Sequence, residues 1–109
     1  MKFDMNKMLQ EAQRMQEELA KAQEEAAGEV VEASAGGGMV TVKANGAGEV
    51  VEIRIDPRAV DPDDPELLAD MVLAAVNEAL RSARSLMESK MSGIVPGDLG
   101  GLGGLLPGS

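Results

Sequence analysis

Three basic side chains recur at intervals of seven residues near the start of the chain. Lys7, Arg14 and Lys21 lie in the segment KMLQEAQRMQEELAKAQ, and on a helix this spacing keeps them on one line that drifts by only ~20° per repeat. Cations in such a row are suited to contacting the phosphates of one nucleic-acid strand. The row is unexpected, because the 109-residue chain has a net charge of −9 and nucleic-acid binding normally requires a basic surface.

The same segment also supports a purely structural explanation. A column of acids accompanies the cations, and Glu11 lies three residues before Arg14 and four after Lys7. Each pair of this kind stabilises a helix by ~0.2–0.5 kcal/mol. From the sequence alone, a solvated helix face with alternating charges also explains the row.

A second basic group, Arg81, Arg84 and Lys90, lies near the end of a later predicted helix. Its structural explanation is solvation of that helix and complementation of the negative end of its dipole. Neither basic group is interleaved with aromatic residues, which single-stranded bases would need for stacking. Contact with the backbone of a duplex is the form of nucleic-acid binding that these residues support.

Other chemistries find little support. The chain contains no cysteine and no histidine, which removes thiolate and imidazole chemistry, and we expect no enzyme, cofactor or small-molecule substrate. The acids Asp61, Asp63, Asp64 and Glu66 resemble a calcium loop, but Pro65 occupies the third ligand position and helix capping explains them better, so no metal site is predicted. The glycines at 36–38 lack the pattern of a phosphate-binding loop and predict a turn.

No apolar run approaches the roughly 20 residues of a membrane span, and the N-terminus has no signal-peptide pattern. We expect a cytoplasmic protein without membrane association.

Two long helices must position the basic groups. Residues 4–27 have apolar residues at alternating intervals of three and four and contain no glycine or proline, which predicts a helix of roughly 35 Å. This length exceeds what a small sheet covers, so part of the helix should project. Asp64 and Pro65 predict the start of a second helix that runs to about Met91 and whose broad apolar face covers a sheet.

Between the helices the hydrophobic period changes to two. The runs GEVVEAS (28–34), MVTVKA (39–44) and EVVEIRID (49–56) are separated by glycine-rich turns that include Asn45 and Gly46, and this pattern predicts a three-stranded antiparallel meander. The fold class is α+β, with one domain over residues 1–91 and a flexible Gly, Leu and Pro-rich tail over 92–109. Phe3 is the only aromatic residue, and so small an interior predicts a homodimer.

These features in this order resemble the YbaB/EbfC family of nucleoid-associated proteins. The matching segments are MQEELAKAQEE, GGGMVTVKANGAGEVVEIRIDP and DDPELLADMVLAAVNEAL, and the resemblance covers about residues 3–91. It implies an α-β-β-β-α subunit that dimerises through its sheet region, with helices projecting as tweezer-like arms that bind double-stranded DNA and alter its conformation. It also implies parts in nucleoid organisation and gene regulation, without catalysis.

The leading hypothesis is thus a homodimer that contacts DNA phosphates in the nucleoid. Its candidate contacts are Lys7, Arg14, Lys21, Arg81, Arg84 and Lys90. The alternative is a protein-interaction module in which the Met and Ala seam of the first helix accepts a partner helix without direct DNA binding.

Overall fold

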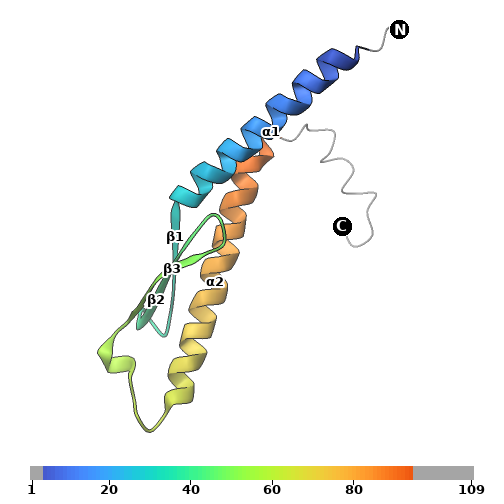
Figure 1. Ribbon diagram of the computed structural model, residues 1–109. Helices are drawn as coiled ribbons and strands as arrows, with labels where there is room; N and C mark the ends of the chain where they lie inside the picture. Colours follow the sequence, from blue (N-terminus) through green and yellow to red (C-terminus); the bar gives the residue numbers. More distant parts are fainter. Residues whose placement is uncertain (1–3, 95–109) are drawn as a thin grey trace, which may run out of the picture.

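The computed structural model describes residues 4–94 and has two long helices that flank a meander (Figure 1). The elements follow in the order α1 (Met5–Gly28), β1 (Val30–Ala35), β2 (Val40–Asn45), β3 (Val50–Ile55), the 3₁₀ turn η1 (Pro57–Ala59) and α2 (Pro65–Ser92). The strands form one antiparallel sheet in the order β1-β2-β3. The predicted α+β class and element order are confirmed.

Helix α2 begins where the sequence predicts, and α1 begins at Met5, one residue after its predicted start. Asp4 precedes α1 and its carboxylate accepts a hydrogen bond from the Lys7 backbone N–H at 3.2 Å, while Asp64 accepts one from Leu67 N–H at 3.2 Å at the start of α2. Such caps satisfy backbone donors that have no partner within the helix. Helix α1 ends at Gly28, one residue beyond the predicted end, so β1 begins at Val30 rather than at Gly28.

The meander has the predicted hairpins, with one irregularity. In the β2–β3 ladder Val40 lies opposite Ile55 and Val42 opposite Ile53, but a bulge then places Ala44 opposite Val50. A bulge inserts one residue and interrupts the alternation of faces.

The segment after β3, predicted as a loop, contains the turn η1. Asp56 accepts hydrogen bonds from the backbone and side chain of Arg58. These bonds and the positive charge of Arg58 lower the pKa of Asp56 to about 2.

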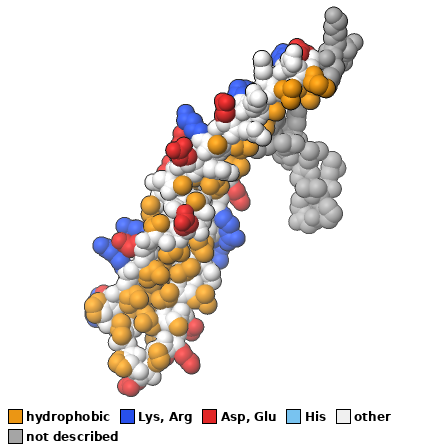
Figure 2. All heavy atoms as spheres, in the orientation of Figure 1, with side chains coloured by type: hydrophobic (Ala, Val, Ile, Leu, Met, Phe, Trp, Pro, Cys, Tyr) orange, Lys and Arg blue, Asp and Glu red, His pale blue; other side chains and the backbone are white. Residues whose placement is uncertain are grey.

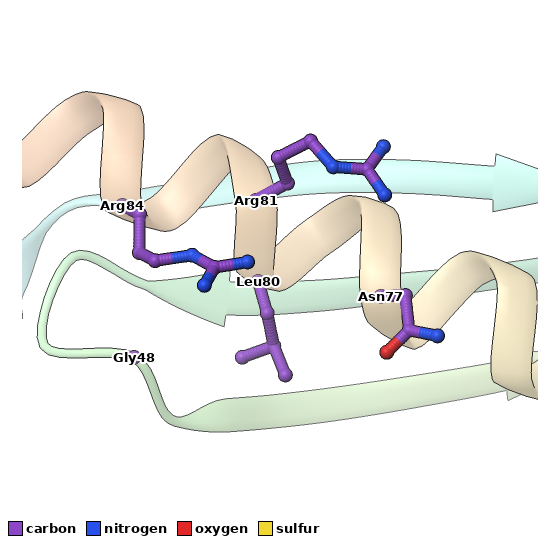
Figure 3. Close-up of a pocket in the computed structure, with 5 residues that line it drawn as sticks. All are labelled: Gly48, Asn77, Leu80, Arg81 and Arg84. Atoms are coloured by element: carbon purple, nitrogen blue, oxygen red, sulfur yellow. The ribbon is translucent and has the colours of Figure 1, made fainter. Parts of the chain in front are cut away.

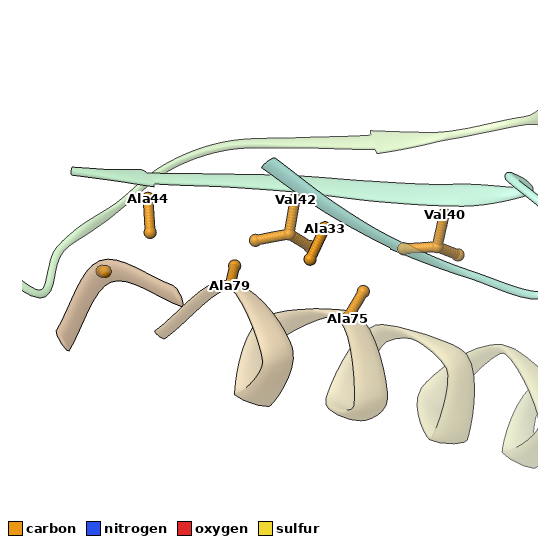
Figure 4. Close-up of a cluster of buried hydrophobic side chains, with 7 residues drawn as sticks. Ala33, Val40, Val42, Ala44, Ala75 and Ala79 are labelled. Atoms are coloured by element: carbon orange, nitrogen blue, oxygen red, sulfur yellow. The ribbon is translucent and has the colours of Figure 1, made fainter. Parts of the chain in front are cut away.

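The core is made almost entirely of small side chains between α2 and the sheet. Figure 4 shows valine and alanine side chains of β1 and β2 facing alanines of α2. The fully buried residues of this layer are Val40, Val42, Ala44, Ala75, Ala79 and Ala83. Alanine lets the helix backbone approach the sheet closely, but the layer gains only the modest burial energy of methyl and isopropyl groups.

The molecule is strongly elongated, with principal extents of 74 × 31 × 16 Å and a radius of gyration of 20.1 Å. A compact chain of this length would have a radius of about 13 Å. The difference arises because α1 leaves the body: only Ala22 and Ala26 of this helix are buried. The predicted projection of α1 is confirmed, whereas the predicted flexible tail lies mainly outside the described residues.

Replacing Val42 with alanine should lower the free energy of unfolding by about 2 kcal/mol, because it removes two fully buried methyl groups and leaves a cavity. Urea unfolding at fixed protein concentration measures the change. Val60→Ala is the matched control, since Val60 is exposed on a loop, and it should change stability by less than about 0.5 kcal/mol. Equal effects of the two substitutions would contradict the assignment of the core.

Candidate nucleic-acid interface

The first basic group lies on the projecting part of α1. We call residues 5–21 the arm, because they precede the two buried alanines of the helix. Lys7, Arg14 and Lys21 are all exposed there, and at 1.5 Å per residue the row spans ~21 Å. Lys7 and Arg14 line one shallow depression together with Gln10 and Glu11.

Few of the cations in this row are paired with an acidic neighbour. Within the described residues, one ion pair involves this row. It joins Arg14 to Glu18 at 3.8 Å between two exposed side chains, and exposed pairs of this kind contribute little to stability. Figure 2 shows acidic and basic side chains interspersed along the arm, with hydrophobic atoms beside them. Because α1 carries five glutamates against its three cations, attraction to a polyanion must be local and short in range.

The two arginines of the second basic group differ in their ion pairing. Arg81 pairs with Glu78, one turn away on α2, whereas Arg84 has no ion pair within residues 4–94. Both arginines line a cleft of about 310 Å³ between α2 and the β2–β3 hairpin. Figure 3 shows Asn77, Leu80, Arg81 and Arg84 projecting from successive turns of α2, with Gly48 on the hairpin opposite.

Asn77 was not identified from the sequence. Its amide can donate a hydrogen bond to a phosphate oxygen. Asn77, Arg81 and Arg84 have the spacing i, i+4 and i+7. That spacing on one helix face was the available signal. The contribution of Gly48 could not be found in this way, because only the tertiary fold brings the hairpin beside α2.

Lys90 is differently placed from the other two cations of α2. Its ammonium lies 2.6 Å from a carboxylate oxygen of Glu29, the residue that follows α1. The hydrogen bond and the negative charge of Glu29 raise the pKa of Lys90 above its ordinary value. A phosphate would have to displace Glu29 to reach this side chain.

The predicted capping role is confirmed for Asp64, and Glu66 lies in the first turn of α2 as expected, whereas Asp61 stabilises the turn before the helix. Asp64 caps α2, and Asp61 accepts a hydrogen bond from the Asp63 backbone N–H at 2.9 Å. Among residues 4–94, no group of three potential ligands is placed to hold a metal ion.

The comparison with known families concerns almost the whole chain. A sequence model described as the YbaB/EbfC DNA-binding family matches residues 1–99. The chain belongs to this family. It is a DNA-binding family and not an enzyme family, and the resemblance seen in the sequence is confirmed.

Several similar proteins are named nucleoid-associated proteins. One from Thermoanaerobacter pseudethanolicus is 54% identical over 95 residues, covering 87% of this chain and 86% of that protein. Another from Acetivibrio thermocellus is 50% identical over 102 residues, covering 94% and 89% respectively. A third from Saccharopolyspora erythraea is 50% identical over 109 residues, with coverages of 96% and 93%.

A solved structure shares the fold. The crystal structure of the uncharacterized protein HP0035 from Helicobacter pylori superposes with a TM-score of 0.77 at 22% identity, covering 87% of this chain and 100% of that chain. At this identity the likeness establishes the architecture alone. Within the described part of this family member, neither helix is long and apolar enough to cross a bilayer.

Replacing Lys7, Arg14 and Lys21 together with glutamine should change the free energy of unfolding by less than about 1 kcal/mol, because the row holds one exposed ion pair and no buried contact. Urea unfolding checks this value. A loss of several kcal/mol would show that the row serves the stability of the helix and would support the structural explanation.

Proposed function

We propose that this protein binds duplex DNA as a homodimer, largely through the phosphate backbone, and alters the conformation of the DNA. Membership in a DNA-binding family supports DNA as the partner. The observation that carries the mode of binding is the projecting arm with its row of exposed cations. On this proposal the protein acts in the cytoplasm at the nucleoid, in nucleoid organisation and gene regulation.

The uncovered side of the sheet supports a second copy as partner. Strand β3 is an edge strand, and α2 packs against β1 and β2 while scarcely touching it. Ile53 and Ile55 lie opposite valines that face α2, yet they remain 46% and 41% exposed. Free edges and exposed apolar patches of this kind mark association surfaces.

An apolar groove extends this surface onto α2. We call it the β3 groove; its lining residues are Ile55, Pro65, Leu68, Ala69, Val72, Leu73 and Val76. Figure 2 shows a broad hydrophobic area where the strands and the first turns of α2 lie. A twofold pairing of two β3 grooves would cover the same patch on both copies and would give the particle two arms.

The proposed dimer should dissociate when one charge is placed in the β3 groove. Leu73→Lys should convert the dimer to a monomer, because a buried unpaired ammonium is costly, and light scattering would show the mass falling to near 11.3 kDa. Val60→Lys introduces the same charge at an exposed position outside the groove lining and should leave the mass unchanged. A wild-type chain that is already monomeric at micromolar concentration would remove the homodimer from the proposal.

The binding mode predicts how affinity depends on salt. Glutamine at positions 7, 14 and 21 should weaken binding to unrelated duplexes alike and flatten the plot of log K against log salt by about 0.9 for each lost phosphate contact. The control variant has glutamine at Lys43, Arg54 and Arg58. It changes the net charge by the same amount as the arm variant, but at positions on the sheet and on the segment after it.

If the arm variant and the control variant bind with the same affinity and salt slope, the arm row is not the contact. A parallel variant with glutamine at Arg81 and Arg84 then tests the cleft on α2. If no duplex binds to the wild-type protein at low salt, DNA binding itself is refuted.

The exposed methionines of the arm support a second candidate function. Met5 and Met8 are 63% and 54% exposed, and methionine adapts to varied partner surfaces. A partner helix docked on this seam would bind with little dependence on salt, whereas phosphate binding weakens steeply as salt increases.

A further inference from the structure

The arm is attached to the body only through the last turns of α1. Ala22 and Ala26 are the buried residues of this helix. Gly46, in the β2–β3 hairpin, donates its backbone N–H to the carbonyl oxygen of Ala26 at 2.9 Å and to that of Glu29 at 3.2 Å. These hydrogen bonds to the hairpin add to the packing of α1 against α2.

A glycine is required at position 46 because the two backbones lie so close together. A Cβ there would lie 2.5 Å from the carbonyl oxygen of Ala26 and 2.7 Å from its Cβ. Gly46 does not have a positive φ angle, unlike Gly48 in the same hairpin. Its role is thus contact with α1, and neither backbone can relieve an added Cβ by a side-chain rotation.

The ion pair of Lys90 with Glu29 ties the same end of α1 to the last turn of α2. Glu29 also supplies one of the carbonyl groups that accept the Gly46 N–H. The hairpin and α2 therefore hold the helix at neighbouring points.

We infer that Gly46 and Lys90 are positioning residues that fix the direction of the arm relative to the sheet. The inference deepens the proposed function and rests on it, since it concerns the arm as the DNA-contacting element. From Ala26 to Lys7 the helix extends ~28 Å, so a rotation of about 10° at its base moves Lys7 by ~5 Å. Two arms that must engage one duplex together lose their joint binding when their geometry is wrong.

The direction of the arm can be measured without DNA. Because the chain has no cysteine, Gln13→Cys on the arm and Ser34→Cys on β1 provide two unique positions for spin labels, both exposed. Double electron–electron resonance gives the distribution of distances between them, and dilution with unlabelled protein suppresses distances between copies. The wild-type protein should give one narrow distribution.

Gly46→Ala should shift or broaden this distribution by ~3 Å or more, because Gln13 lies ~20 Å along the helix from Ala26 and a rotation of about 10° moves it by that amount. Gly28→Ala is the matched control, because Gly28 lies at the same end of α1 and a Cβ there meets nothing within 4 Å. It should leave the distribution unchanged. A folded Gly46→Ala variant with the wild-type distribution would overturn the role of Gly46.

Lys90→Gln separates positioning from phosphate contact and does not depend on whether Gly46→Ala folds. Positioning predicts a broader distance distribution together with an affinity for DNA at least about tenfold lower. A phosphate contact predicts an unchanged distribution and a slope reduced by about 0.9 per copy, and this result would overturn the positioning role.

Under the proposed function, Lys21→Gln should leave the distance distribution unchanged and reduce the salt slope by about 0.9 per copy. If the wild-type protein binds no DNA, the proposed function fails while the distance measurements still decide whether these residues fix the arm.

Discussion

The close packing of α2 against the sheet through alanine is the constraint on which the rest of the structure depends. Ala75, Ala79 and Ala83 bring the helix near Val40 and Val42 of the central strand. A helix that sits this close covers β1 and β2 and leaves the apolar side chains of β3 exposed. The subunit therefore has a thin, one-sided core, and its free edge is available for a second copy.

The arm follows a different principle, because local interactions rather than a core maintain it. Asp4 caps its first turn, and no glycine or proline interrupts it before Gly28. The buried residues of α1, Ala22 and Ala26, lie at its base, where the helix contacts α2 and the β2–β3 hairpin. Because of this division, we expect replacement of the exposed cations of the arm to cost little stability, whereas a single Cβ at Gly46 is expected to redirect the helix.

The sequence was sufficient to predict the two long helices and the three strands, because each of them carries a local signal. The interval of three and four residues in α1, the alternation in β2 and the cap at Asp64 depend only on neighbouring residues. The features that define the site depend on residues distant in sequence. The pairing of Lys90 with Glu29, the approach of Gly46 to Ala26 and the cleft between Arg84 and Gly48 arise only when α2 packs on the meander, and no local pattern encodes them.

The central claim is that a second copy of the chain completes the subunit by covering β3 and the groove beside it. Equilibrium unfolding in urea, repeated over about a hundredfold range of protein concentration, tests it directly, because folding that is coupled to association depends on concentration. The account predicts that the urea midpoint rises steadily with protein concentration. A midpoint that stays constant over this range would contradict the claim and would show that the thin alanine core suffices alone.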